Sequence, residues 1–416
     1  MAEQHEKALV PQIRFTGFTD PWEQRKLGEV GITYSGLHGK TKDDFGHGDA
    51  FFVPYTNVFD NPVTDQGRLE HVEVDSSQAE VKHGDVFFTV SSETPEEVGM
   101  SSIWLGNIRN VYLNSFCFGY RQDGSFDSLY LAYVLRSQSV RKQIELLAQG
   151  ISRFNISKNK VMNVEVPKPS LGEQRRIGAF LDRLDSLITL HQGKYDKLCV
   201  LKKSMLDKMF PKGGSLYPEI RFAGFTDPWE QRKLGELASK RIEKNTNGIK
   251  ETFTNSAEHG VVSQLDYFDH DITNDANIGN YSVVHPDDFI YNPRISAVAP
   301  CGPINRNKLD RNGVMSPLYT VFSVDDTIDK LYLEHYFKTS RWHQFMFLEG
   351  NSGARSDRFS ISDSIFFEMP IQCPVLEEQE LIASFFGRLD SLITLHQRKL
   401  ELLRNIKKSM LDKMFV

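Results

Sequence analysis

The sequence contains two copies of one unit, and this internal repeat constrains the fold more than any other feature. Residues 13–30 read IRFTGFTDPWEQRKLGEV and residues 220–237 read IRFAGFTDPWEQRKLGEL, so 16 of 18 positions agree at an offset of 207. We call this segment the opening motif. RLDSLITLHQ occurs at 183–192 and 388–397, and KKSMLDKMF occurs at 202–210 and 407–415, both at an offset of 205. The 416-residue chain is therefore expected to form two similar domains.

The two copies differ between their shared ends. Residues of roughly 38–150 and 248–350 show only scattered agreement, such as HGDVFFTV at 83–90 against HPDDFIYN at 285–292. Random divergence after a duplication would not leave the ends of the two copies nearly identical while the segments between them changed. The pattern indicates one common frame that carries two different recognition or catalytic surfaces.

The shared tails have the pattern of long helices. Apolar residues recur at spacings of three and four from Ile177 to Met209 and from Ile382 to Met414, which is typical of a coiled-coil or bundle seam. Each helix is predicted to run for about 38 residues, or about 57 Å, and Ser170 with Glu173 forms a capping-box pattern at the first start. We expect the two helices to pair through seam positions that include Leu184, Leu187, His191, Leu198, Leu389, Leu392, His396 and Leu403.

The remaining segments predict an α+β fold. Short apolar runs at 50–53, 86–90, 261–262 and 289–291 are bounded by Gly, Pro, Asn and Asp, as strands are. One helix-like stretch closes each half, near 128–148 and 329–348. The predicted order is an N-terminal segment with a first globular domain (1–168), a long helix (169–212), a linker with a second globular domain (213–374) and a second long helix (375–416).

The composition and sequence patterns argue against several classes of protein. No stretch approaches the roughly 20 apolar residues of a membrane helix, and MAEQHEKALV lacks an apolar signal core, so a cytoplasmic protein without a membrane partner is expected. The four cysteines contain no CxxC pair, which argues against a zinc knuckle. The net charge is −6, so nucleic-acid binding would need local basic patches or a more basic partner.

No catalytic or cofactor motif stands out. The sequence has no G-x-x-x-x-G-K-[ST] loop, no G-x-G-x-x-G turn and no H-E-x-x-H pair. Asn292-Pro293 matches only the first half of an amino-methyltransferase motif, because Arg294 follows. Asp75, Glu80 and Lys82 loosely match a metal-dependent nuclease, but a solvated turn is the simpler interpretation. No metal site is predicted.

Basic and polar clusters remain, and they occur in both halves. Residues 151–160 (ISRFNISKNK), 291–311 and 353–358 (GARSDR) combine Arg and Lys with Asn and Ser. Lys and Arg neutralise phosphates, and Arg, Asn and Gln can read base edges. Any one cluster alone could be a solvated loop, but their recurrence favours DNA recognition.

These features together identify a resemblance. The FTDPWEQRKLGE motif, the EQRRI and EQELI helix starts and the repeated RLDSLITLHQ and KKSMLDKMF tails resemble the specificity (S) subunit, HsdS, of bacterial type I restriction–modification systems. The likeness covers nearly the whole chain. It implies two target-recognition domains separated by two long antiparallel helices, each domain reading one half of a bipartite double-stranded DNA target with a nonspecific spacer.

The resemblance also implies the partners. The helices would dock two methyltransferase subunits, which recruit restriction subunits, and S-adenosylmethionine, ATP and magnesium would be bound by those partners and not by this non-enzymatic chain. The expected DNA-contacting residues are polar or basic side chains at strand ends and loops. In the first domain they are Tyr55, Asn57, Ser91, Ser92, Glu93, Thr94, Arg153, Asn155 and Lys158. In the second they are Asn255, Glu258, Asn292, Arg294, Ser296, Arg306, Arg355 and Arg358.

Two other functions are weighed against DNA recognition. A scaffold could use the helix pair only to assemble partners, but the Arg, Asn and Ser clusters in both globular parts favour DNA reading. A self-sufficient nuclease or methyltransferase is opposed by the missing motifs.

Overall fold

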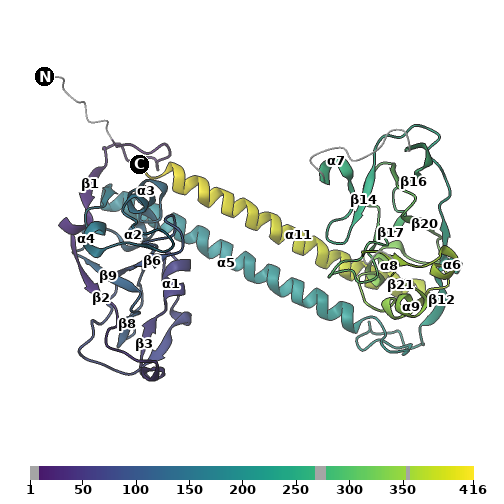
Figure 1. Cartoon of the computed structure of the whole chain (residues 1–416), viewed down its shortest axis with the longest axis horizontal. Coiled ribbons are helices and arrows are strands. Elements are labelled where there is room, and N and C mark those ends of the chain that lie inside the picture. Colours follow the sequence, from purple (N-terminus) through teal and green to yellow (C-terminus); the bar gives the residue numbers. More distant parts are fainter. Residues whose placement is uncertain (1–8, 268–277, 353–356) are drawn as a thin grey trace. The chain divides into compact units, whose positions relative to one another are not determined.

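The computed structural model describes residues 9–267, 278–352 and 357–416. The chain divides into two compact units, of which unit 1 comprises Met1–Gln192 with Gln397–Val416 and unit 2 comprises Gly193–His396. Each unit combines one mixed helix-and-sheet domain with segments of both long helices, α5 (Leu171–Lys208) and α11 (Leu376–Lys413) (Figure 1). The predicted α+β class is confirmed.

Unit 1 is organised around a four-stranded antiparallel sheet in the order β2-β9-β5-β7. Phe88 of β5 pairs with Phe118 of β9, and their rings stack 5.2 Å apart within the main core. A second sheet, β4-β3-β8, packs its own smaller core. The strands are β1 (Glu23–Lys26), β2 (Gly31–Ser35), β3 (Phe45–Val53), β4 (Glu70–Val72), β5 (Val86–Thr89), β6 (Ser91–Ser92), β7 (Ser101–Ile103), β8 (Val111–Leu113), β9 (Cys117–Gln122), β10 (Phe154–Asn155) and β11 (Glu165–Lys168).

Unit 2 repeats this plan with different side chains. Its four-stranded sheet has the order β13-β20-β17-β18, and Phe289 of β17 stacks on Phe322 of β20 at 5.5 Å. Two-stranded ladders β14-β15 and β16-β19 lie beside it. The strands are β12 (Glu230–Lys233), β13 (Ala238–Lys240), β14 (Phe253–Ser256), β15 (Gly260–Ser263), β16 (Ser282–Val284), β17 (Phe289–Tyr291), β18 (Ile304–Arg306), β19 (Gly313–Met315), β20 (Thr320–Val324), β21 (Asn351–Ser352), β22 (Phe359–Ser360) and β23 (Pro370–Cys373).

Each helix-like stretch that closes a domain is two short helices, so the prediction of one continuous helix is wrong in both units. In unit 1, α2 (Ser128–Val134) ends before Ser137, whose extended backbone starts α3 (Gln138–Leu146). In unit 2, residues 337–342 separate α8 (Lys330–Tyr336) from α9 (His343–Glu349), and Trp342, which starts α9, has a helical backbone conformation. The other short helices are α1 (Tyr55–Asp60), α4 (Lys158–Val161), α6 (Leu234–Leu237), α7 (Gln264–Tyr267) and α10 (Asp363–Phe366).

The opening motif fastens each domain to the start of its long helix. Its EQRK segment forms β1, which pairs with β11 just before α5, and β12 pairs with β23 just before α11. Arg14 donates to both carboxylate oxygens of the fully buried Glu173, at 2.7 and 2.8 Å. Arg221 contacts Glu378 in the same bidentate manner. Both halves need this clamp, which gives a physical reason for the repeated motif.

The first turn of α5 departs from the predicted capping box. The Ser170 hydroxyl accepts a hydrogen bond from the Glu173 amide at 3.4 Å, as expected. The Glu173 carboxylate does not return to the N-cap amide, because Arg14 and Trp22 Nε1 (3.2 Å) occupy it. The next residue, Gln174, accepts from the Asp127 amide at 2.8 Å and so joins α5 to the start of α2.

Within each unit one ion pair joins α5 to α11, and the two ion pairs lie at equivalent positions of the repeat. In unit 1, Asp185 of α5 contacts Lys407 of α11 at 2.5 Å, and Gln192 accepts from Arg404 at 2.9 Å, so the two segments run antiparallel there. In unit 2, Lys202 of α5 contacts Asp390 of α11. The two ion pairs join the same two repeat positions, because both Asp residues come from RLDS and both Lys residues from KKSMLD.

The predicted seam is partly buried. Leu184 and Leu389 are buried, and Leu187, His191, Leu198, His396 and Leu403 are half-buried. Leu392 is 43% exposed, so its assignment to the buried seam is wrong. A spacing of three and four marks one face of the helix, but only the packing decides which part of that face is covered.

Candidate nucleic-acid interface

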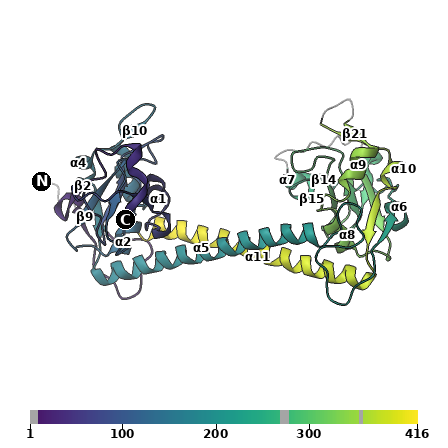
Figure 2. The same ribbon diagram turned by 90° about the horizontal axis from the view of Figure 1, so that it is seen from below.

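In unit 1, the structure brings two predicted segments together. β6 pairs with β10, so that Asn155 lies opposite Ser91 and Phe154 lies opposite Ser92. Glu93 and Thr94 follow β6, Arg153 precedes β10, and all three are exposed together with Asn155. Figure 2 shows β10 at the end of unit 1 away from α5. We call this set, residues 91–94 with 153–158, the unit 1 edge.

Side-chain hydrogen bonds hold the unit 1 edge in place. The Tyr55 hydroxyl donates to the Ser91 carbonyl at 2.8 Å, and burial raises the pKa of Tyr55, so the phenol stays protonated as a donor. The Ser92 hydroxyl donates to Glu97 at 3.1 Å, and Lys158 donates to the Ser35 hydroxyl at 2.9 Å. The polar side chains of Tyr55 and Ser92 therefore support the edge, while the exposed residues remain available to a ligand.

Two arginines that sequence reasoning missed fix the loops beside this edge. Arg141 donates to the carbonyls of Glu96, Val98 and Gly99 at 2.6–2.8 Å. Arg136 donates to the Ser101 carbonyl at 2.7 Å and to three carbonyls of residues 58–61 at 2.9 Å. Burial lowers the pKa of Arg136 to about 10, which still leaves it charged at neutral pH. No sequence pattern marks these residues, because their acceptors are backbone groups.

Asn57 does not belong to the interface. It is fully buried, its amide nitrogen donates to the carbonyls of Asp65 (2.8 Å) and Arg68 (3.2 Å), and its amide oxygen accepts from the Asp65 amide. An amide whose donors and acceptors are all used inside the fold cannot read a base. The prediction of a DNA contact at Asn57 is wrong.

Unit 2 brings the equivalent segments together. Arg294 forms a β-bridge with Arg358, flanked by hydrogen bonds from the Phe359 amide to the Pro293 carbonyl (2.8 Å) and from the Ile295 amide to the Asp357 carbonyl (3.0 Å). Arg294 and Ser296 are exposed, and Arg358 is half-buried. We call residues 293–296 with 357–358 the unit 2 edge. As in unit 1, it joins the segment after the central strand of the four-stranded sheet (β5 in unit 1, β17 in unit 2) to the RF(N/S)IS segment that both halves share.

Three of the predicted unit 2 contacts are structural. Asn255 is buried and joins Asn305 (2.6 Å) and the Ile290 carbonyl (2.7 Å), while Asn292 donates to the Asn255 carbonyl at 2.8 Å and accepts from the Arg294 amide at 3.0 Å. Arg306 is held by Glu334 at 2.9 Å and by Asp287. Assigning Asn255 and Arg306 to DNA is therefore wrong, and Asn292 orients the backbone of Arg294.

Glu258 is exposed in the turn between β14 and β15, away from these contacts in sequence. Arg355 lies outside the described residues.

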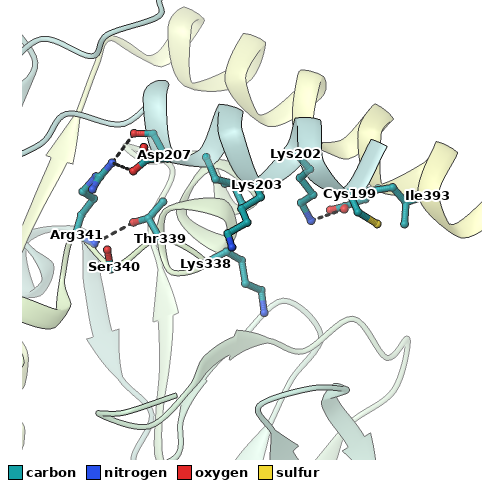
Figure 3. Close-up of a pocket in the computed structure, with 11 residues that line it drawn as sticks. Cys199, Lys202, Lys203, Asp207, Lys338, Thr339, Ser340, Arg341 and Ile393 are labelled. Carbon is teal, nitrogen blue, oxygen red and sulfur yellow. Dashed lines mark hydrogen bonds and ion pairs between the residues drawn. The ribbon is translucent and has the colours of Figure 1, made fainter. Parts of the chain in front are cut away.

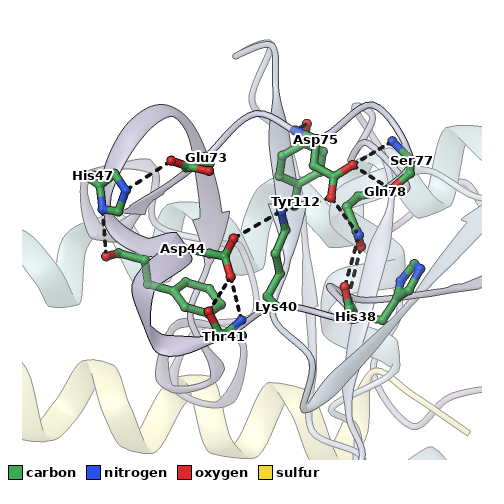
Figure 4. A network of polar contacts seen from close by, with 11 residues as sticks. His38, Lys40, Thr41, Asp44, His47, Glu73, Asp75, Ser77, Gln78 and Tyr112 are labelled. Carbon is green, nitrogen blue, oxygen red and sulfur yellow. Dashed lines mark hydrogen bonds and ion pairs between the residues drawn. The ribbon is translucent and has the colours of Figure 1, made fainter.

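The loose nuclease pattern is a structural network in unit 1 (Figure 4). Asp75 accepts from the Ser77 hydroxyl at 2.6 Å, contacts Lys40 at 3.0 Å and accepts from Gln78, and these contacts hold the pKa of Asp75 well below its usual range. Glu80 accepts a hydrogen bond from the Asn110 amide at 2.7 Å. Among the described residues, no group of three or more His, Cys, Asp or Glu side chains is arranged to hold a metal ion.

Comparison with known proteins identifies the family. The sequence profile described as the type I restriction modification DNA specificity domain matches residues 19–199 and again residues 226–405. The chain belongs to this family. The two matches correspond to the two repeats, so each half is one specificity domain, and the protein is a DNA-recognising specificity subunit (HsdS) rather than an enzyme.

Individual relatives agree with this assignment. A Methanocaldococcus jannaschii protein assigned as the MjaX type I restriction enzyme specificity subunit is 22% identical, over 94% of this chain and 92% of its own. The MjaVIII specificity subunit of the same organism is 23% identical over 69% of each chain. The type I restriction–modification S subunit from M. genitalium has the same fold, with a TM-score of 0.59, 12% identity and coverage of 98% and 99%. No helix in the described part of this subunit is both long and apolar enough to cross a membrane.

Proposed function

We propose that this specificity subunit reads a bipartite DNA target, with the unit 1 edge contacting one half-site and the unit 2 edge contacting the other. The observation that carries the proposal is that both units use the same two segments, the one after the central strand and the RF(N/S)IS segment, yet present different side chains there. Ser91, Glu93 and Thr94 accompany Arg153 in unit 1, whereas Arg294 accompanies Arg358 in unit 2. Base-edge readout depends on the donors and acceptors presented, so the two edges would select different bases.

The two long helices would set the distance between the half-sites and dock the catalytic partners. A helix of 38 residues spans about 57 Å, which exceeds the 34–36 Å of one turn of DNA. Two methyltransferase subunits would bind the shared helices, and restriction subunits would join through them. S-adenosylmethionine, ATP and magnesium would act in those partners.

Methylation mapping tests this proposal directly. Cells with and without the subunit are compared by genome-wide sequencing of methylated bases, and a bipartite motif is expected to disappear on deletion. Arg294→Ala should then alter only one half of that motif. The matched control is Arg311→Ala, since Arg311 is similarly exposed in unit 2 but pairs with Glu251 at 3.0 Å away from the edge. A continuous motif, or no change of methylation on deletion, would contradict the proposal.

A further inference from the structure

The two units contain pockets at equivalent places. In unit 2, a pocket of about 560 Å³ is lined by residues of the KKSMLD segment of α5, by Asp390 of α11 and by Lys338–Arg341 after α8 (Figure 3). In unit 1, a pocket of about 460 Å³ is lined by the KKSMLD segment of α11, by Asp185 of α5 and by Arg136 and Gln138 after α2. The repeat has therefore built the same pocket twice, each time from both long helices and one domain.

Both pockets carry the same excess of positive charge. Each is lined by four basic and two acidic side chains, a formal charge of +2. In unit 2 they are Lys202, Lys203, Lys338 and Arg341 with Asp207 and Asp390, and in unit 1 they are Arg136, Arg404, Lys407 and Lys408 with Asp185 and Asp412.

In each KKSMLD segment, the first lysine forms an ion pair with an aspartate and the second does not. Lys202 is bound to Asp390 and Lys407 to Asp185, while Arg341 contacts Asp207 at 3.2 Å. In the described part of the chain, the exposed Lys203 and Lys408 have no carboxylate within ion-pair distance. Figure 3 shows the Lys203 side chain extending from α5 toward the segment that carries Lys338. Each pocket therefore offers an ammonium group without a carboxylate partner at the same repeat position, whereas Lys338 of the unit 2 pocket donates to Asn305 Oδ1.

The shared construction indicates what occupies the pockets. The two edges that would read DNA differ between the units, whereas the two KKSMLD lysines and the RLDS aspartate are the same in both pockets, so the occupant should be the same on both sides. The pockets lie on the long helices, and Figure 2 shows β10 and β21 at the ends of their units away from those helices. A pair of identical partner molecules fits both facts better than the two different half-sites do.

We propose that each pocket receives an acidic side chain from one copy of the methyltransferase partner, with Lys203 and Lys408 as the equivalent anchoring residues. This inference rests on the docking role proposed above and supplies its chemistry. A carboxylate entering the pocket meets an unpaired ammonium group and further N–H donors, which is the arrangement of a charge-assisted hydrogen bond. Because one pocket belongs to each unit, one partner copy would depend on Lys203 and the other on Lys408.

The test measures stoichiometry with the complete chain and the purified methyltransferase subunit. Light scattering after size-exclusion chromatography should show two methyltransferase copies on the unaltered subunit, one on Lys203→Glu, one on Lys408→Glu and none on the double variant. Lys194→Glu with Lys399→Glu is the matched control, because these exposed lysines occupy equivalent positions of α5 and α11 outside the pockets and should retain both copies.

The outcomes separate this inference from the docking proposal itself. Failure of the unaltered subunit to bind methyltransferase would refute both the docking role and the assignment of the pockets. Two bound copies on the double variant, with unchanged affinity, would overturn only the assignment of the pockets. Retained assembly with weaker binding to every DNA duplex, and a smaller dependence on salt, would instead assign the pockets to backbone phosphates.

Discussion

Replacing Glu173 by Gln should destabilise the junction between the first recognition domain and α5 by about 3 kcal/mol, because breaking a buried ion pair typically costs 3–5 kcal/mol. Glu173 is fully buried and accepts from Arg14 at 2.7 and 2.8 Å and from Trp22 at 3.2 Å. Arg14 is 13% exposed, so water can partly solvate the abandoned guanidinium, which favours the low end of the range.

The repeat provides an internal comparison for this prediction. Glu378 accepts the same bidentate contact from Arg221, at 2.8 Å for both bonds, but within the described residues Trp229 Nε1 has no hydrogen-bond acceptor. Glu378→Gln should therefore cost about 1 kcal/mol less than Glu173→Gln, the typical value of one hydrogen bond. Glu23→Gln is the exposed control. Glu23 contacts Arg25 at 3.1 Å with both side chains largely in solvent, so its loss should cost under about 1 kcal/mol.

Native-state hydrogen exchange can measure these costs locally. Peptides covering the first three turns of α5 and α11 report the opening free energy of each junction in one molecule. The double variant Arg14→Met with Glu173→Met should recover most of the loss, because an apolar pair of similar volume often replaces a buried ion pair without penalty. If Glu173→Gln changed the opening free energy of α5 no more than Glu23→Gln does, the clamp would not stabilise the junction.

Four further outcomes are expected. Burial lowers the pKa of His335 from 6.5 to about 4, so the unfolded state binds more protons between those values and unit 2 should lose about 2 kcal/mol on going from pH 7.5 to pH 5. Urea unfolding at the two pH values tests this. His335 occupies in α8 the position that Tyr133 occupies in α2, where the Tyr133 hydroxyl donates to Asp185 at 2.9 Å, so His335→Tyr should abolish the difference. Arg294→Ala should weaken specific DNA binding by about 1–3 kcal/mol, and an unaltered affinity and base preference in a fluorescence titration would remove it from the interface. A fragment ending at Gly214 should form a twofold dimer, and with methyltransferase it should recognise an inverted repeat of the first half-site; light scattering showing only monomer would reject this. The isolated subunit should transfer no methyl group from S-adenosylmethionine, and turnover by partner-free protein would refute that.

The residues predicted for the interface show which of their properties can be predicted from sequence and which cannot. Exposed Arg153, Asn155 and Arg294 could be selected because basic and polar residues in turn-rich segments tend to lie at the surface, and the structure places them on equivalent edges. Asn57, Asn255 and Arg306 have the same residue types and similar neighbours, yet they satisfy backbone and carboxylate groups inside the fold. Composition does not distinguish an amide that faces solvent from one that faces an unpaired carbonyl.

The sequence by itself determined the duplication, the two long helices and the family, because these depend on residue identity at fixed spacing, and helical periodicity is a local property of the chain. Only the tertiary structure decided what the repeated residues do. Glu173 has the spacing of a capping box but binds Arg14, a partner 159 residues earlier in the chain. In each pocket the two KKSMLD lysines come from one repeat, whereas the aspartate that neutralises the first of them comes from the other. Such contacts depend on which distant segments the fold brings within a few ångströms, and no local pattern encodes that.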